Sequence, residues 1–143
     1  MTEFNFLTTH VGSMPHKTLN GLTGYLHSLL DVPAWPQLPH RSFHESMYAQ
    51  YSPTLPAICE DAVQEKVYFN TSADITDALE AFYTPVLSDD VENFALHPDY
   101  AHGFFAMLET LRQTDGQWAK GQVTGPISFG LTVTDQDLRA SLY

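Results

Sequence analysis

The chain has 143 residues, 43% of them hydrophobic and 13% aromatic, a composition that predicts one globular domain over residues 1–143 and excludes an intrinsically disordered protein. The chain has 17 acidic and 6 basic residues, and the basic ones form no stripe, which excludes a nucleic-acid-binding surface. No run of about 18 apolar residues is present that could span a membrane. The opening MTEFNFLTTH has no basic-then-apolar leader pattern, and the single cysteine, Cys59, cannot form an internal disulfide, so a cytoplasmic location is expected.

The acidic residues are concentrated between Ala57 and Glu92, where nine acids stand against one base, Lys66. We interpret this segment as a solvated face that keeps the protein soluble. The alternative is a docking surface for a basic partner. Cys59 lies in an apolar stretch of the same segment and is interpreted as a small buried hydrophobe rather than a nucleophile.

The first predicted elements are a strand and a helix separated by a glycine turn. Phe4–Val11 is short and rich in β-branched and aromatic residues, which predicts a strand that ends at Gly12-Ser13. Apolar residues at helical spacing then predict a helix over Lys17–Leu30. These residues are Leu19, Leu22, Leu26 and Leu29.

The next part of the chain is irregular. Val32–Pro39 contains three prolines in eight residues, so it is expected to be a loop or at most a short strand. A short helix is predicted over Phe43–Tyr51. Ala57–Cys59 and Lys66–Asn70 flank a polar turn, which predicts a β-hairpin.

Two longer helices are predicted from apolar stripes. The first follows a candidate cap at Ser72, and the second has Pro98 in its first turn and ends at Asp115-Gly116. The two stripes consist of Ile75, Leu79, Phe82 and Val86, and of Tyr100, Phe104, Leu108 and Leu111.

The remaining elements are a strand and two helices. Trp118–Val123 predicts a strand, and Thr124–Pro126 closes it and opens a helix. Asp135–Tyr143 is expected to be helical and has no terminal cap, so the chain is expected to be cut rather than finished. The alternation of strands and helices indicates an α/β fold with parallel strands.

The sharpest local motif is the segment Thr8–Pro15, in which a strand runs into Gly12-Ser13 and then into a helix. Free backbone N–H groups and the helix dipole at such a turn favour a bound carboxylate. An ordinary strand-to-helix turn, in which glycine only supplies an unusual φ, is the alternative, and spacing alone favours it.

A second motif lies in the loop from Trp35 to Arg41, which concentrates aromatic, polar and proline residues. In this motif Arg41 could pair with a carboxylate and Glu45 could bind an amine. A rigid connector with surface charges is the alternative. His40 and His44 are four residues apart, but no cysteine or carboxylate completes a zinc-ligand set, so no metal site is expected in this chain.

A third motif, Lys120–Gly130, repeats the pattern of a strand that ends in a Gly-Pro turn. Together with TTHVGSMPH and WPQLPHRSFHESMYAQ, in this order, it resembles the superfamily of cobalamin-independent methionine synthases and uroporphyrinogen decarboxylases. The chain is most similar to the short, single-barrel members of the methionine synthase-like kind, and the resemblance covers nearly its whole length.

The resemblance implies the N-terminal part of a (β/α)₈ TIM barrel, here with a β-hairpin insertion, in an enzyme that transfers a methyl group to the thiol of homocysteine. It implies that Val11, Gly12 and Ser13 contact the amino-acid substrate. Zinc activates the thiol in this family, but its ligands come from the later half of the barrel. No catalytic residue and no cofactor are therefore expected in this chain, and zinc is expected only in the complete enzyme.

Two positions depart from the family pattern. Arg41 stands where classical members carry a substrate-contacting glutamate, and Thr132 stands where they carry a tryptophan. These departures leave the methyl donor open between a folate and a corrinoid. About three of the eight βα units are present, so no methyl transfer is expected from this chain alone.

Two other functions remain open. One is a uroporphyrinogen decarboxylase-like enzyme fragment, although the arginine-rich opening typical of that class is absent. The other is a non-catalytic half-barrel that serves as a binding or assembly module. An open barrel also leaves strand edges unpaired, which predicts a homo-oligomer formed through those edges.

Overall fold

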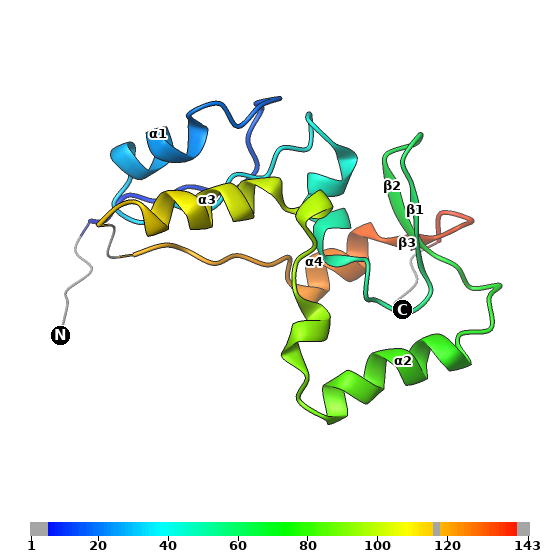
Figure 1. Cartoon of the computed structure of the whole chain (residues 1–143). Helices are drawn as coiled ribbons and strands as arrows, with labels where there is room; N and C mark the ends of the chain where they lie inside the picture. Colours follow the sequence, from blue (N-terminus) through cyan, green and yellow to red (C-terminus); the bar gives the residue numbers. More distant parts are fainter. Residues whose placement is uncertain (1–5, 116–117, 140–143) are drawn as a thin grey trace. The chain divides into compact units, whose positions relative to one another are not determined.

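The computed structural model describes residues 6–115 and 118–139 and shows a mixed α/β fold (Figure 1). The chain divides into two compact units, each built from two stretches of sequence. The first unit comprises Met1–Ser46 and Ala101–Gln122, and the second comprises Met47–Tyr100 and Val123–Tyr143. No helix in the described part has the length and apolarity needed to cross a membrane.

The first unit contains three extended segments that pair in parallel. Residues 31–37 lie between residues 8–14 and residues 118–122. Two isolated β-bridges join residues 31–37 to residues 8–14, and one joins them to residues 118–122. The paired residues are Thr9 with Val32, Ser13 with Gln37, and Ala34 with Lys120. Parallel neighbours require crossover connections, and α1 (Leu22–Leu29) lies between the first and second segments in the sequence.

The core of the first unit lies between α1, α3 (His102–Arg112) and the proline-rich segment 31–39. Helical spacing places the apolar side chains of each helix on one face, and the two faces meet. The buried cluster consists of Leu22, Leu26, Trp35, Leu38 and Met107. Polar side chains add to the contact, since Thr110 Oγ1 donates to Thr23 Oγ1 at 2.8 Å.

The second unit contains the predicted hairpin. Strand β1 (Ile58–Asp61) pairs antiparallel with β2 (Lys66–Phe69), and the short β3 (Thr134–Asp135) adds to β2 in parallel. Helix α2 (Thr76–Leu87) follows the hairpin, and α4 (Pro126–Thr132) precedes β3.

Short 3₁₀ helices complete the structure. They span Phe43–Glu45 in the first unit, and Ala49–Tyr51, Val91–Phe94 and Pro98–Tyr100 in the second. The single helix predicted over Phe43–Tyr51 was therefore wrong, because the chain forms two separate 3₁₀ turns there.

The predicted helix over Lys17–Leu30 is confirmed, but it begins later than expected. Gly21 adopts a left-handed conformation with φ of 66°, and α1 starts directly after it. Because a residue with positive φ cannot continue a right-handed helix, the positions before Gly21 form a turn instead.

The caps predicted for the two long helices were wrong. Asp74, rather than Ser72, receives the backbone N–H of Thr76 at the start of α2, at 3.0 Å. Pro98 lies in a separate 3₁₀ helix before α3 rather than in its first turn. Helix α3 ends at Arg112, and Gly116 of the predicted stop lies outside the described residues.

The predicted strands of the first unit are reduced to bridges. Within the described part of Phe4–Val11 only Thr9 forms a bridge, and within Trp118–Val123 only Lys120 does. The helix predicted over Asp135–Tyr143 was wrong for residues 135–139, because Asp135 ends β3 and its Oδ1 accepts the N–H groups of Asp137 and Arg139. Residues 140–143 of that prediction lie outside the described chain.

Candidate functional site

The glycine turn of the first motif lies at the carboxyl end of the three parallel segments. Gly12 is buried, and its carbonyl accepts the N–H of Gln37 at 2.7 Å. A Cβ at Gly12 would lie 2.9 Å from the Trp35 carbonyl oxygen and 1.7 Å from Nε2 of Gln122. Glycine is therefore required here by close approach of the neighbouring segments.

The Gly12 N–H already has an acceptor within the protein. It donates to Oε1 of Gln122 at 3.2 Å, while Nε2 of Gln122 donates to Oε1 of Gln37 at 3.3 Å. One glutamine thus joins all three segments at their carboxyl ends. A ligand carboxylate could reach the Gly12 N–H by displacing this side chain. The flanking Val11 and Ser13 are exposed.

Further polar contacts hold the same segments together below the turn. His10 Nε2 lies 3.2 Å from the backbone N of Ala34, and Lys120 Nζ donates to the carbonyl of His10. Because these groups are satisfied by backbone partners, they act as structural ties between the segments.

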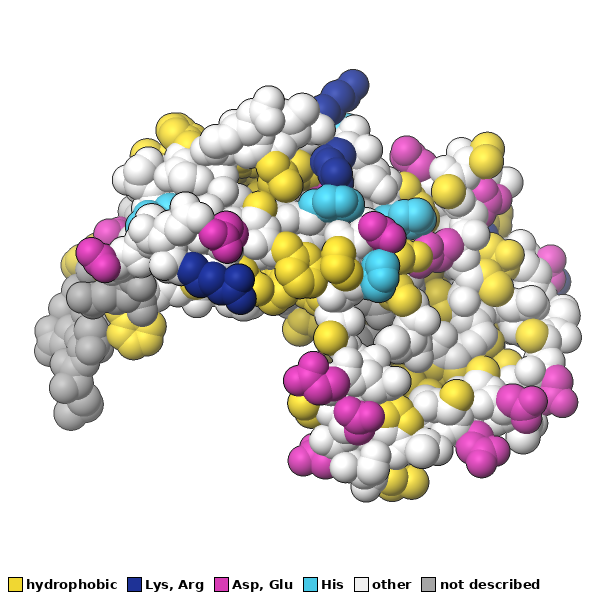
Figure 2. All heavy atoms as spheres, viewed as in Figure 1, with side chains coloured by type: hydrophobic (Ala, Val, Ile, Leu, Met, Phe, Trp, Pro, Cys, Tyr) yellow, Lys and Arg dark blue, Asp and Glu magenta, His cyan; other side chains and the backbone are white. Residues whose placement is uncertain are grey.

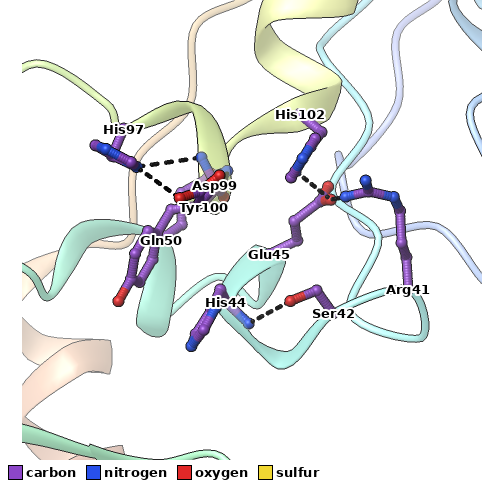
Figure 3. Close-up of polar contacts among 9 residues, drawn as sticks. All are labelled: Arg41, Ser42, His44, Glu45, Gln50, His97, Asp99, Tyr100 and His102. Atoms are coloured by element: carbon purple, nitrogen blue, oxygen red, sulfur yellow. Dashed lines mark hydrogen bonds and ion pairs between the residues drawn. The ribbon is translucent and has the colours of Figure 1, made fainter.

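The second motif forms a charged cluster around Glu45 (Figure 3). The Glu45 side chain has no solvent exposure, and its Oε1 accepts from Arg41 Nη1 at 2.5 Å. Nδ1 of His102 lies 3.2 Å from the same oxygen, without the angle of a hydrogen bond. The Arg41 and His102 side chains are about one third exposed, at 32% and 35%.

Local structure explains how these three side chains meet. Ser42 caps the 3₁₀ turn Phe43–Glu45 by accepting the N–H of His44 at 3.3 Å, which turns Glu45 inward. At the other side, Gly103 packs directly on Pro36, since a Cβ there would lie 1.7 Å from the Pro36 carbonyl oxygen. The missing side chain lets α3 begin close to the loop, and so brings His102 to Glu45.

Two buried atoms of the cluster, Oε2 of Glu45 and Nδ1 of His102, make no hydrogen bond within the described part of the chain. Within residues 6–115 and 118–139, no donor forms a hydrogen bond to Oε2 of Glu45, although this atom is buried. A buried carboxylate oxygen without a donor is costly, by about 1–3 kcal/mol or more. An ammonium group would satisfy it and neutralise its charge, while the exposed part of Arg41 can pair with a carboxylate.

The sequence named Arg41 and Glu45 as separate contacts to a ligand, whereas the structure pairs them with each other. Sequence reasoning missed His102, which lies far from both in the chain. The signal that could have found it is the His-Gly pair at the start of α3, since a glycine at a helix start permits close approach.

The third motif is shared between the two units. Lys120 and Gln122 belong to the first unit, whereas Pro126 opens α4 in the second, as predicted. Thr132, which departs from the family pattern, donates to the Tyr48 hydroxyl at 3.1 Å. Hydrogen bonds with Ser128 and Thr132 lower the pKa of Tyr48 below its usual value.

The described residues contain no group of three or more His, Cys, Asp and Glu side chains that could hold a metal ion. Comparison of the chain with protein-family models, with curated proteins and with solved structures finds no match.

Proposed function

We propose that the first unit binds the amino-acid substrate of a cytoplasmic methyltransferase, as the N-terminal part of a methionine synthase-like (β/α)₈ barrel. The substrate is homocysteine or a related thiol, and a folate or corrinoid donates the methyl group. The proposal rests on the sequence resemblance and on the geometry of the Glu45 cluster. No step is assigned to zinc in this chain, because the described residues do not form a ligand set for it.

The arrangement of the first unit supports a barrel-like origin. The three parallel extended segments are neighbours in the order in which they occur in the sequence. Helix α1 precedes the second segment, and α3 precedes the third. In a (β/α)₈ barrel the active site lies at the carboxyl ends of such strands. The glycine turn at Gly12 and the loop that leads to Arg41 both follow these ends.

The observation that carries the proposal is the unpartnered Oε2 of Glu45. An α-amino acid offers an ammonium group for this oxygen and a carboxylate for Arg41, which is partly exposed. The ammonium of the substrate thus takes the position of the missing donor. Charge-assisted hydrogen bonds of this kind are about twice as strong as neutral ones.

Isothermal titration calorimetry with three matched ligands tests the proposal. L-methionine, which has no free thiol that could form a disulfide, carries both charged groups; 4-(methylthio)butanoate lacks the amine, and 3-(methylthio)propylamine lacks the carboxylate. We expect L-methionine to bind at least tenfold more tightly than either analogue. Equal binding of the amine-free acid, or no binding of L-methionine at millimolar concentration, would contradict the proposal.

A pair of variants assigns the binding to the cluster. Glu45→Gln keeps the size of the side chain but removes its charge, and we expect it to weaken L-methionine binding at least tenfold. Glu109→Gln is the matched control, because Glu109 is an exposed glutamate of the same unit that lies outside the cluster and pairs with Arg112 at 3.6 Å. The control is expected to bind as the unmodified chain does.

We further propose that this chain alone performs no methyl transfer, because a (β/α)₈ enzyme assembles its site from loops of several strands. A turnover assay with homocysteine, zinc and either methyl-folate or a methylated corrinoid checks this directly. We expect no methionine above background. Turnover by the purified chain would show that a catalytic site exists within it.

The chain is also proposed to form a homo-oligomer through its open strand edges. In the described part, residues 8–14 form an outer segment beside residues 31–37, and an edge segment favours pairing with another chain. Light scattering at micromolar concentration is expected to give a mass above that of the monomer. A clean monomer would reject this proposal.

A further inference from the structure

The second unit contains a cavity that the proposed function does not use. It is open on one side, has a volume of about 720 Å³ and is formed by α2, the 3₁₀ helix Val91–Phe94, the turn after it and residues 50–55. All of its lining residues belong to the second unit. Its size lies in the range of small-molecule sites, about 300–1,000 Å³.

The walls of the cavity are mainly apolar and aromatic. Phe82 and Phe94 meet edge to face with ring centroids 5.6 Å apart, so the two rings present a fixed corner to the cavity. Tyr51 and Tyr100 line it as well, and burial raises the pKa of each to about 12. These phenols therefore stay uncharged at neutral pH.

Three polar side chains of the wall, those of Tyr100, Gln50 and His97, form hydrogen bonds within the protein. The Tyr100 hydroxyl donates to Oε2 of Glu60 at 2.8 Å, so this end of the side chain is used within the unit. Gln50 Nε2 donates to the Tyr100 carbonyl at 2.9 Å. Figure 3 shows His97 beside Asp99, whose backbone N–H reaches His97 Nδ1 at 3.2 Å.

The surroundings of the cavity are strongly acidic. No Lys or Arg occurs between Lys66 and Arg112, whereas the segment that builds the cavity carries Asp90, Glu92 and Asp99 close to its lining residues. Figure 2 shows acidic side chains gathered over the region of α2, interspersed with apolar ones. The potential at the cavity therefore repels anions.

We propose that this cavity binds an aromatic small molecule that carries no negative charge. The aromatic corner supplies stacking and edge contacts to a ring, which stabilise a bound aromatic group beyond the effect of the area buried. A carboxylate on the ligand would lose its hydration in an apolar site and would be repelled by the nearby acidic side chains. A neutral or cationic ring suffers no such repulsion, and a cation gains from the aromatic faces.

Calorimetric titration of the full chain with three naphthalene probes tests the proposal. The probes are 1-naphthalenemethanol, 1-naphthylmethylamine and 1-naphthoate, which share one ring system and differ in charge. We expect the alcohol and the amine to bind, and the naphthoate to bind at least tenfold more weakly. Absence of binding by the alcohol and the amine, or equal binding of the naphthoate, would overturn the proposal.

Two tryptophan variants locate the binding. Ala95→Trp fills the cavity from its lining and is expected to weaken binding of the alcohol at least tenfold. Ala81→Trp is the matched control, because Ala81 lies on α2 outside the cavity lining, and it is expected to bind normally. Unchanged binding by a folded Ala95→Trp would place the probe elsewhere and reject the site.

NMR spectroscopy of the unmodified chain locates the bound probe without relying on the tryptophan variants. The ring current of a bound naphthalene should shift the methyl resonances of Val86 and Leu96, which line the cavity. Methyl groups of α1 should not move. Shifts confined to other parts of the chain would overturn the assignment even if the variants failed to fold.

Discussion

The two units of this chain differ most in their charge and in what they bury. The first unit, over residues 1–46 and 101–122, has five acids, four bases and six of the seven histidines. The second, over residues 47–100 and 123–143, has twelve acids and two bases. The first unit buries a carboxylate beside an arginine and a histidine, whereas the second surrounds an apolar cavity.

This difference separates two kinds of recognition. A buried charge such as that of Glu45 selects a ligand with a complementary charge, because an unmatched charge is expensive to bury. An apolar cavity within an acidic surface selects by shape and by the absence of negative charge. Changes confined to one unit should therefore leave the binding and stability of the other unit unaltered.

Gly103→Val should damage the first unit most. A Cβ at Gly103 would lie 1.7 Å from the Pro36 carbonyl oxygen, so α3 must move away from the loop. We expect a loss of about 3 kcal/mol in the free energy of unfolding, as for overpacked cores. Urea unfolding followed by far-ultraviolet circular dichroism measures it.

Gly24→Ala is the control for that change. Gly24 lies inside α1 with nothing within 4 Å of a Cβ placed there. Alanine should stabilise the helix by roughly 0.5–1 kcal/mol. If both variants destabilised the chain equally, the packing of α3 on Pro36 would not explain the effect.

Glu45→Ala should rank next. It removes the acceptor of Arg41 and leaves a void in a buried site. Breaking a buried pair costs about 3–5 kcal/mol, but Arg41 is partly exposed and water can replace the lost partner, so we expect about 2 kcal/mol. The same urea experiment applies, with exposed Glu109→Ala expected to change stability by less than about 0.5 kcal/mol. If Glu45→Ala left the free energy of unfolding unchanged, the structural role of the cluster would be contradicted.

Alkaline pH should act on the second unit. Tyr51 and Tyr100 have pKa values raised to about 12, whereas a tyrosine in the unfolded chain ionises near 10. The unfolded chain therefore loses these protons first, and the stabilisation present below pH 10 falls progressively between pH 10 and about 12. Hairpin and α2 resonances should weaken in this range before those of α1.

The phenolate absorbance provides the check. A late phase near pH 12 should be present in the unmodified chain and reduced in Tyr51→Phe and in Tyr100→Phe. Tyr25 is the only tyrosine of the first unit, so Tyr25→Phe serves as the control and should leave the late phase intact. A late phase of undiminished amplitude in both cavity variants would refute the assignment.

The smallest effect is expected for Thr132→Ala. This change removes the hydrogen bond from Thr132 to the Tyr48 hydroxyl, which is worth about 0.5–1 kcal/mol at a site that is partly exposed. The same loss should raise the pKa of Tyr48, because Thr132 helps to lower it. Thermal unfolding and a tyrosine titration measure the two consequences, and no change in either would contradict the contact.

The regular part of the fold could be predicted from local pattern. Leu22 and Leu26 on α1, and Phe104 and Leu111 on α3, repeat at helical spacing and do pack on the core. The hairpin followed from two β-rich runs around a polar turn. These predictions succeeded because the regular spacing of apolar residues in the sequence marks the face of each element that packs against its neighbours.

The failures came from short-range polar contacts and from pairing between distant segments. Asp135 holds the turn after β3 through its own carboxylate, which competes with a helix there. The contact of His102 with Glu45 joins parts of the chain that no spacing relates. The cavity around Phe82 and Phe94 was also missed, because the stripe that predicted α2 does not show which face remains uncovered.

The central claim is that the two units recognise different ligands at separate sites. A ¹⁵N-labelled chain titrated first with L-methionine and then with 1-naphthalenemethanol tests it in one sample. We expect L-methionine to shift the amide resonances of Gly12, Arg41 and Glu45, and the naphthalene to shift those of Phe94 and Leu96. Overlapping sets of shifted residues, or no response to either ligand, would contradict it.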